Sequence, residues 1–396
     1  MRYTDTTPIP ALVDEVLALS QSAENVRCQR NRNALLARDE SYVPAVMPLL
    51  NKLYVAESVG INLRDIRRDP ELNVRLELIS KILNFERFAG DTPLVPELLI
   101  YLGVSFEPEL CGIPSREMDG HEPWIGEPIL GSAAAAAGLT VPSPTDLRST
   151  AIMQTAVRLY EGAQDLVGDL MPVHMQGWYA GHLRVVQKLR GEACFFADLY
   201  DDPQAVHRMF GYVDQVRQQY DRVRCDLVGD VPCHAASTYW DFQALANDEV
   251  SGHLISAQHY EEFIYPYDLA FCKDYPRVYY HGDGKFTPFL PLIKTLPNVE
   301  MIEVGRHTDL AQAAQVLGDK VAFDVTFSEV DREFTGSGEL QQELLDRIVT
   351  AAGDSFFHIV LFVNACGGEA DADVKNFIDA SRQAIERHWD RRREQP

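Results

Sequence analysis

The sequence is poor in basic residues. Its 396 residues include 36 Lys and Arg against 59 Asp and Glu, which gives a formal net charge of −23. A nucleic-acid surface needs clustered Lys and Arg, and the one dense basic run, residues 391–393, is typical of a solvated tail. Nucleic acid is therefore excluded as the expected partner. A polyanionic substrate is disfavoured, although a local pocket can differ from the net field.

Paired cysteines and long apolar runs are also missing. The seven Cys are odd in number and form no CxxC pair, which argues against a disulfide framework and favours a reducing compartment. The first residues do not resemble a signal peptide. The longest apolar stretches, residues 132–139 and 358–363, fall far short of the roughly 20 residues that span a bilayer. We expect a cytoplasmic protein with no membrane contact.

The composition is that of a globular protein, with 46% hydrophobic and 24% charged residues. Eight apolar segments alternate with helical patterns, and consecutive apolar positions are typical of parallel strands covered on both faces. Eight such units predict an α/β fold of the (β/α)8 barrel type, with a doubly wound open sheet as the alternative. The predicted strands are residues 43–49, 92–99, 170–175, 234–240, 277–281, 299–304, 321–326 and 357–363.

Two regions lie outside this alternation. Residues 10–38 have a helical pattern, so we expect an N-terminal helical extension over residues 1–40 and a barrel over residues 41–396. Residues 103–145 are irregular, yet they contain Trp124 and further apolar residues. They are interpreted as an excursion or lid above the core.

In a parallel barrel the active site lies at the carboxyl ends of the strands. Side chains of the types that bind metals or substrates follow the predicted strands or lie near their ends. Several such residues at one end of the barrel favour a functional site over isolated helix caps. These residues are His174, Gln176, Tyr239, Trp240, Asp241, His281, Asp283, Glu303, His307, Asp324, Asn364 and Cys366.

Residues 279–284, Tyr-Tyr-His-Gly-Asp-Gly, are the most informative segment. Two glycines flank Asp283, so the backbone can turn sharply. His281 and Asp283 are two residues apart, on one side of an extended chain, and this spacing suits two ligands of one metal ion. The alternative is that Asp283 caps the next helix and His281 is simply buried.

Residues 363–368, Val-Asn-Ala-Cys-Gly-Gly, form a second candidate segment. Cys366 follows the last predicted strand and precedes a helix, where the pKa of a thiol is lowered and a thiolate ligand or nucleophile is favoured. The alternatives are that Cys366 is a small buried residue and that Asn364 satisfies loop backbone.

Several of these segments resemble the uroporphyrinogen decarboxylase superfamily, including its corrinoid-linked methyltransferases. The resemblance covers about residues 25–388, is strongest after residue 240, and implies a (β/α)8 barrel. It is carried by Arg32 with Leu35 and Leu36, by Val43 with Pro44, and by residues 251–267, 280–284, 317–320, 364–368 and 374–379.

The resemblance implies a zinc site. The methyltransferases of the superfamily bind zinc through a His-x-Cys pair and a later Cys, which correspond here to His281, Asp283 and Cys366. Asp283 replaces the middle Cys, and a carboxylate still binds zinc but admits other divalent metals. Glu303, which ends a neighbouring predicted strand, is the candidate fourth ligand.

The first functional hypothesis is a metal-dependent methyltransferase. It would move a methyl group between a small O-, N- or S-methyl compound and a corrinoid or thiol, with the corrinoid supplied by a partner protein. The resemblance to this family also makes a homodimer the expected oligomer. The candidate proton-transfer residues are His174, Tyr239, Asp241 and Glu303, and the candidate cofactor-binding residues are Trp178, Trp240 and Asn364.

Two alternatives stay open. One is a decarboxylase or lyase acting on a small carboxylated substrate, with Asp283 or Asp241 as the acid or base. The Arg-rich N-terminal motif by which the decarboxylases hold a tetrapyrrole is missing here, which weakens a tetrapyrrole substrate. The other is a non-catalytic barrel that binds a ligand or a corrinoid protein.

Overall fold

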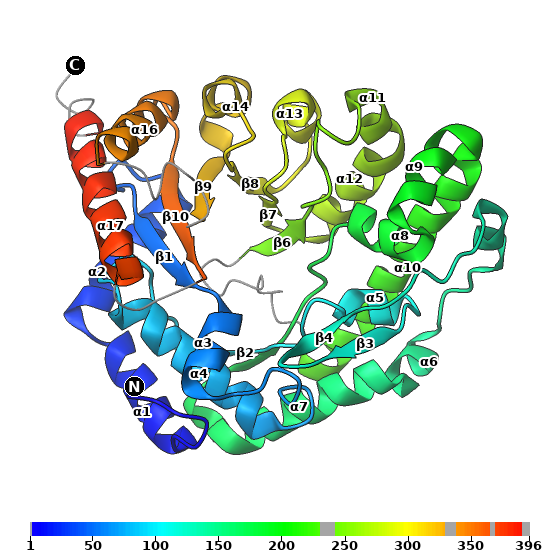
Figure 1. Cartoon of the computed structure of the whole chain (residues 1–396), viewed down its shortest axis with the longest axis horizontal. Coiled ribbons are helices and arrows are strands. Elements are labelled where there is room, and N and C mark those ends of the chain that lie inside the picture. The colour runs from blue at the N-terminus through cyan, green and yellow to red at the C-terminus, as the bar shows by residue number, and fades with distance from the viewer. Residues whose placement is uncertain (1, 230–241, 329–337, 365–368, 390–396) are drawn as a thin grey trace.

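The computed structural model describes residues 2–229, 242–328, 338–364 and 369–389. Its centre is a ring of parallel strands surrounded by helices (Figure 1). Six strands form one sheet in the order β1-β10-β9-β8-β7-β6, and β2 pairs with β5. A parallel bridge between Ala180 and Ala246 joins the chain after β5 to β6. The predicted (β/α)8 barrel is therefore confirmed.

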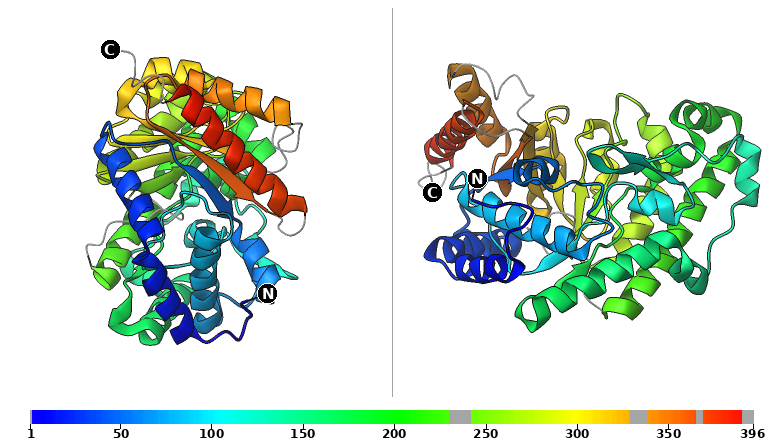
Figure 2. Two further views of the ribbon diagram at one scale, coloured as in Figure 1. Left: turned by 90° about the vertical axis from the view of Figure 1, so that its left-hand side faces the viewer. Right: turned by 60° about the horizontal axis from the view of Figure 1, so that its bottom comes forward.

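The barrel strands are β1 Val46–Leu50, β2 Leu98–Ile100, β5 Val173–Met175, β6 Gln243–Ala246, β7 Val278–His281, β8 Val299–Glu303, β9 Ala322–Ser328 and β10 Phe357–Val363. β1, β6 and all but one residue of β10 are buried. This burial explains why their sequences are apolar at consecutive positions, as expected for strands packed on both faces. Seen from the side, β1 lies beside β10 (Figure 2).

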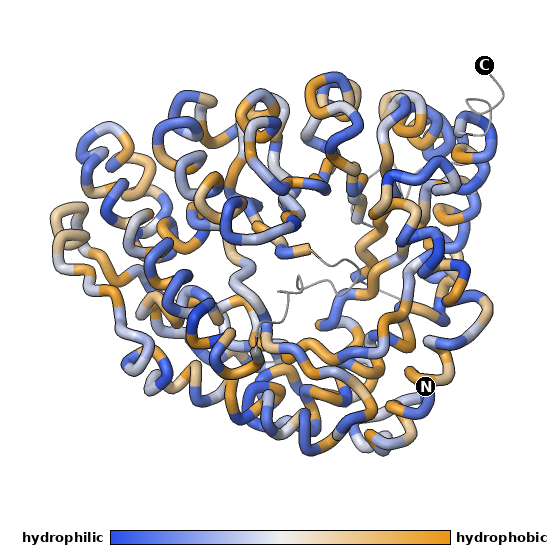
Figure 3. The backbone as a smooth tube through the Cα atoms, turned by 180° about the vertical axis from the view of Figure 1, so that it is seen from behind, coloured by the Kyte–Doolittle hydropathy of each residue, from blue (hydrophilic) through white to orange (hydrophobic). Residues whose placement is uncertain are grey.

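Helices form the outer layer, and hydrophobic and hydrophilic residues alternate along them (Figure 3). This alternation lets one face of each helix pack on the strands. The helices are α1 Ile9–Ser20, α2 Ala23–Ala37, α3 Lys52–Val59, α4 Pro70–Glu86, α5 Phe106–Leu110, α6 Pro144–Ser149, α7 Ala151–Val167, α8 His182–Arg190, α9 Glu192–Asp201, α10 Pro203–Val228, α11 Ala257–His259, α12 Tyr265–Asp274, α13 Leu290–Ile293, α14 Leu310–Leu317, α16 Gly338–Ala351 and α17 Glu369–His388. None of the described helices is long and apolar enough to cross a membrane.

Among the described strands, none pairs with one edge of β1. Hydrogen bonds to β10 use the carbonyl of Ala45 and the N–H of Asn51, so Val46, Pro48 and Leu50 direct their backbone groups to the other side. An edge of this kind needs other partners for its donors and acceptors, because unpaired backbone groups are unfavourable when buried.

Other groups satisfy that edge of β1. Oδ2 of Asp91 accepts a hydrogen bond from the N–H of Val46 at 3.0 Å, and the backbone N–H of Asp91 donates to the carbonyl of Val46 at 2.8 Å. Pro48 has no N–H to satisfy, which is why proline is tolerated at strand edges. The N–H of Leu50 donates to Oδ1 of Asn84, on α4, at 2.7 Å. α4 thus takes the place of a strand beside the upper part of β1.

Two buried asparagines pair with backbone in the same region. Asn73, on α4, donates to the carbonyl of Tyr101 at 2.8 Å and accepts from its N–H at 3.3 Å. Asn25, on α2, forms the same pair of bonds with Leu94, at 2.9 and 2.8 Å. The predicted N-terminal helical extension therefore contributes directly to the barrel wall, and its buried residues belong to the same hydrophobic core as the strands.

The excursion near 103–145 contains α5, a hairpin of β3 Ser115–Met118 and β4 His121–Ile125, and a 3-10 helix at Ala133–Gly138. Glu122, on β4, attaches the hairpin to the end of β2. Its carboxylate accepts from the Tyr101 hydroxyl and from the N–H of Val104, both at 2.9 Å. Gly103 permits this approach, because a Cβ there would lie 2.3 Å from Glu122.

Some predicted bounds differ from the structure. The fourth predicted strand, residues 234–240, lies outside the described ranges, and the observed β6 is Gln243–Ala246. The helix expected over residues 10–38 is interrupted at Ser22, whose hydroxyl caps α2 by accepting from Asn25 N–H. The chain is interrupted in the same way between α6 and α7 by Thr150, which caps α7. Hydroxyl caps favour a new helix start, and the apolar periodicity continues across them.

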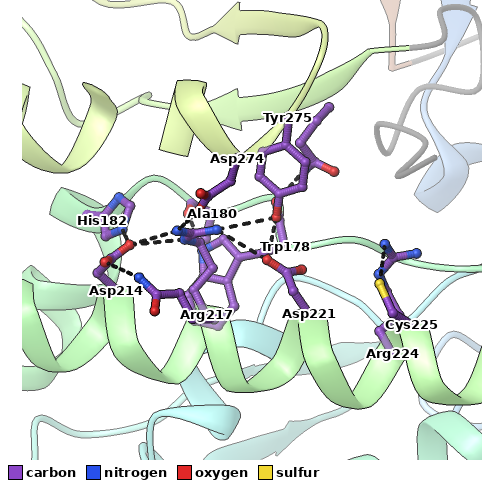
Figure 4. A network of polar contacts seen from close by, with 12 residues as sticks. Trp178, Ala180, His182, Asp214, Arg217, Asp221, Arg224, Cys225, Asp274 and Tyr275 are labelled. Atoms are coloured by element: carbon purple, nitrogen blue, oxygen red, sulfur yellow. Dashed lines mark hydrogen bonds and ion pairs between the residues drawn. The ribbon is translucent and has the colours of Figure 1, made fainter. Parts of the chain in front are cut away.

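An ion-pair network joins three outer helices. Arg217, on α10, is fully buried, and its guanidinium lies between three carboxylates (Figure 4). The N–O distances are 2.9 Å to Asp214, 3.2 Å to Asp221 and 2.5 Å to Asp274, at the end of α12. His182, the first residue of α8, is 3.2 Å from Asp214. Burial raises the pKa of Asp214, but His182 and Arg217 together lower it to about 2.

Replacing Arg217 with Met should destabilise the fold strongly. The aliphatic part is kept, but three carboxylates lose their common partner, and breaking a buried ion pair costs about 3–5 kcal/mol. Urea denaturation measures this loss. Arg148→Met is the control, because Arg148 and Asp226 form an exposed pair at 2.8 Å, for which a loss of about 0–1 kcal/mol is expected. Equal losses in the two variants would contradict the role of Arg217.

Candidate functional site

The barrel encloses a cavity of about 430 Å³ that reaches the carboxyl ends of the strands. Its wall combines apolar residues from β1 and β10 with polar residues from β7, β9 and α4. The lining residues are Met47, Leu49, Leu50, Asn51, Lys52, Glu77, Ser80, Lys81, Asn84, Phe85, Thr92, Pro93, Leu94, Val95, Tyr101, Tyr179, Ala244, Tyr279, His281, Asp324, Val360 and Phe362. Carboxyl ends of barrel strands are where enzymes of this fold place their active sites.

His281 and Glu303 form an ion pair at the rim of this cavity. They are the last residues of β7 and β8, and Nδ1 of His281 lies 2.5 Å from Oε2 of Glu303. The same oxygen accepts the N–H of Gly282 at 3.0 Å. Burial lowers the pKa of His281, but the charge of Glu303 and its hydrogen bond raise it to about 10, with help from Asp248 and Asp324. The metal-free imidazole is therefore cationic at neutral pH.

Asp324 is the centre of a second cluster, deeper in the barrel. Tyr279 donates its hydroxyl to Oδ2 of Asp324 at 2.5 Å, and Thr326 donates to Oδ1 at 3.0 Å. Nε2 of His358, on β10, lies 3.3 Å from Oδ1. Burial raises the pKa of Asp324, but the charge of His358 and the hydrogen bonds from His358, Tyr279 and Thr326 together lower it. Tyr279 also lies 3.3 Å from Nδ1 of His281, so the two clusters are continuous.

A third cluster lies on the α4 side of the cavity. Glu77 is held between two lysines, with Nζ of Lys52 at 2.6 Å and Nζ of Lys81 at 3.6 Å. Burial lowers the pKa of Lys81. Burial raises the pKa of Glu77, but the charges of Lys52 and Lys81 lower it overall, so this carboxylate stays ionised.

The predicted site residues fall into three groups. His281 and Glu303 come together at the cavity rim, and Asn364 lies at the same edge, where it accepts a hydrogen bond from Asn51 at 2.9 Å. His174 pairs with Glu97 at 3.2 Å and is not among the cavity-lining residues. The predicted residues Tyr239, Trp240, Asp241 and Cys366 lie outside the described residues.

Trp178 and Asp283 are not among the cavity-lining residues. Trp178 is fully buried, and its indole N–H donates to the carbonyl of Ala180 at 2.7 Å, so it packs in the core and does not line the cavity. Asp283 is exposed. β7 ends at His281, and Gly282 has φ 152°, so the alternation of an extended chain does not continue to Asp283.

Sequence reasoning missed four residues beside the cavity. Tyr279 had a signal, since it is two residues before His281 and so shares its face of the strand. Asp248 follows β6, and the sequence analysis predicted the fourth strand at residues 234–240 instead of Gln243–Ala246. Ser80 and Lys81 are on a helix, and no periodicity shows that a helix will line the interior of a barrel.

Each ring nitrogen of His281 lies next to a carboxylate. Glu303 holds Nδ1, and the other ring nitrogen, Nε2, lies 3.5 Å from Oδ1 of Asp248. Two ligands of one tetrahedral zinc are about 3.4 Å apart, and a metal-binding histidine commonly donates its second ring N–H to a carboxylate. Within the described residues, no three His, Cys, Asp or Glu side chains form a complete cluster. The ligand set of His281, Asp283 and Cys366 therefore stays a prediction.

Comparison with known proteins identifies the family. The family model described as uroporphyrinogen decarboxylase (URO-D) matches residues 29–324. The chain belongs to the uroporphyrinogen decarboxylase family. No curated protein matches the sequence significantly. Among solved structures, a methyltransferase from Methanosarcina mazei is similar with a TM-score of 0.61 and 14% identity, over 90% of this chain and 97% of that one. At this identity the likeness shows the fold, and it agrees with the barrel expected of a uroporphyrinogen decarboxylase family member.

Replacing Glu303 with Gln should change how stability depends on pH. Because the folded-state pKa of His281 is about 10, its stabilising contribution is full below the ordinary value of about 6.5 and is lost as the pH rises toward 10. Without the Glu303 charge this pH-dependent loss should shrink. Urea denaturation of EDTA-treated protein at about pH 6, 7.5 and 9 measures it.

Glu300→Gln is the control, because Glu300 is on the same strand and pairs with Arg277 at 2.7 Å. Its pH dependence between about pH 6 and 9 should match the unmodified chain. If the stability of Glu303→Gln depended on pH in the same way as that of the unmodified chain, the ion pair would not control the protonation of His281.

Proposed function

We propose that this protein is a methyltransferase of the uroporphyrinogen decarboxylase family. It would move a methyl group between a small O-, N- or S-methyl compound and a corrinoid or a thiol, with the corrinoid carried by a partner protein. The observation that carries the proposal is the His281 imidazole, which Glu303 holds through Nδ1 while Nε2 lies 3.5 Å from Asp248 inside the barrel rim. The methyltransferase from Methanosarcina mazei, which shares the fold, supports it.

In this proposal a divalent metal, with zinc as first candidate, is bound by His281. Asp248 would be the second ligand by geometry, and Cys366 would keep the role expected from the sequence, whereas Asp283 is exposed beyond the end of β7. The bound metal would supply Lewis-acid chemistry, which lowers the pKa of a thiol or polarises a leaving oxygen or nitrogen. Glu303 then acts as a positioning residue, because it fixes the ring orientation and the tautomer of His281.

The remaining polar residues of the cavity handle protons and exclude water. The Tyr279 hydroxyl lies 2.5 Å from Asp324 and 3.4 Å from Glu303, so it can pass a proton between the rim and the interior. Burial raises the pKa of Tyr279 well above its usual value, which keeps the hydroxyl protonated. The apolar side chains of β1 and β10 keep the reacting groups in a low-dielectric space, where such interactions are stronger.

The metal test uses the purified full chain. Elemental analysis should find about one equivalent of a divalent metal, and zinc titration of chelated protein should restore it. His281→Asn should abolish binding, and Glu303→Gln should weaken it by about 10- to 100-fold. His121→Asn, on the exposed turn side of β4, is the control and should bind as tightly as the unmodified chain. Unchanged metal affinity in His281→Asn would refute the proposed site.

The activity test follows methyl transfer from methylcobalamin to 2-mercaptoethanol. The methyl group leaves cobalt(III) for sulfur, the cobalt keeps the bonding electron pair as cobalt(I), and the thiol releases its proton. Loss of the methylcobalamin absorbance should depend on the protein, on metal and on His281. A rate that equals the protein-free rate for methylcobalamin and for a panel of small methyl compounds would remove this function.

A carboxy-lyase is the second candidate. The Tyr279–Asp324 pair favours it, because a buried hydroxyl beside a carboxylate can deliver the proton that replaces a carboxyl group. Release of CO₂ from a small carboxylic acid by chelated protein would support this reaction over methyl transfer. Ligand binding without either turnover would instead support a non-catalytic barrel.

A further inference from the structure

α4 forms one wall of the barrel cavity. Glu77, Ser80, Lys81 and Asn84 all line it, and their spacing of three, four and seven residues places them on one face of the helix. The face is held in place at its end by Asn84, which accepts the N–H of Leu50 at 2.7 Å. These side chains therefore meet a bound molecule in a fixed arrangement.

This wall carries two lysines at the cavity. Lys52 and Lys81 both line the cavity, and their Nζ atoms lie 2.6 and 3.6 Å from the carboxylate of Glu77. Glu97 also acts on Lys81, but it is not among the cavity-lining residues. Lys52, whose side chain is 24% exposed, additionally lies 4.7 Å from the ring centre of Tyr101. A local cationic surface of this kind can attract an anion in a chain whose net charge is negative.

Ser80 is the independent observation that points to a ligand. It is 3% exposed and lines the cavity, yet its hydroxyl has no hydrogen-bond partner among the described residues. A buried hydroxyl without a partner is unfavourable, and nearly all such groups are satisfied in native proteins by protein, water or ligand. Next to Lys81, this hydroxyl is placed to donate to an oxyanion.

We propose that Ser80 and Lys81 of the α4 wall, together with Lys52 at the start of α3, bind the carboxylate of the substrate. The inference rests on the proposed function and narrows its substrate to a small methylated carboxylic acid. The carbon skeleton would lie along the apolar side chains of β1 and β10, and the reacting end would point to His281. Glu77 acts as a positioning residue that holds both lysines at the wall.

Benzoate is the probe, because it joins one carboxylate to a small apolar body. Calorimetric titration of the full chain should show saturable binding of benzoate. Benzamide, which has the same shape without the charge, should bind at least about tenfold more weakly. Inorganic phosphate tests the other common oxyanion. Phosphate binding tighter than benzoate, with the same dependence on Lys81, would overturn the assignment to a carboxylate.

Ser80→Ala separates a binding role from a structural one. Because the hydroxyl has no hydrogen-bond partner in the described part of the chain, its removal should leave the melting temperature unchanged or slightly higher, while benzoate binding weakens by about tenfold. Lys81→Met should abolish measurable binding. Lys188→Met removes a lysine–glutamate pair far from the cavity, at 2.7 Å in the structure, and should bind benzoate normally. Unchanged affinity in both Ser80→Ala and Lys81→Met would refute the proposal.

Failure of this proposal and failure of the methyltransferase proposal are distinguishable. Benzoate binding is measured without turnover, and it should persist in chelated protein and in His281→Asn. If benzoate does not bind but His281-dependent metal binding and methyl transfer are found, the carboxylate assignment alone is wrong. If benzoate binds at the α4 wall and no methyl transfer occurs, the carboxylate assignment stands and the reaction is another one.

Discussion

The unpaired edge of β1 is the constraint on which the interior of this barrel depends. A parallel strand must satisfy the backbone groups on both of its sides, and within the described ranges β1 pairs with a strand on one side only. Pro48 removes one donor, and Asp91 and Asn84 satisfy two others. Because Asn84 belongs to α4, the hydrogen bond that completes the edge also brings a helix face to the cavity. Helical residues can then supply charge where a strand would supply alternating apolar side chains.

The cavity consequently has polar side chains both on β7 and β9 and on α4, and the walls formed by β1 and β10 are apolar. His281 and Glu303 lie at one end, on adjacent strands whose last residues meet at the rim. Lys52 and Lys81 lie on the α4 side, around Glu77. Each cluster contains both signs of charge, which limits the cost of burying it. A substrate with different chemistry at its two ends would meet a complementary surface at both.

The sequence predicted the barrel and the rim pair because both follow from local pattern. Apolar runs mark buried parallel strands, and the rule that active sites lie at their carboxyl ends selects His281 and Glu303 without knowledge of contacts. Asp283 shows where the rule stops. Its spacing from His281 implies a shared face only while the chain stays extended, and the strand ends at His281 itself, before Gly282. The position of Lys81 depends on the unpaired edge of β1, which no local pattern reveals.

The pairing of Asn25 with Leu94 has a consequence for the boundary between the N-terminal extension and the barrel. The Asn25 side chain, on α2, bonds both the N–H and the carbonyl of Leu94, as a neighbouring strand would, and Leu94 lines the cavity. A shortened chain that began at residue 41 would retain every barrel strand, but it would leave this backbone amide and carbonyl without their partners. The first two helices thus share one hydrophobic core with the strands. Removing them would take away the side chain that holds the cavity wall at Leu94.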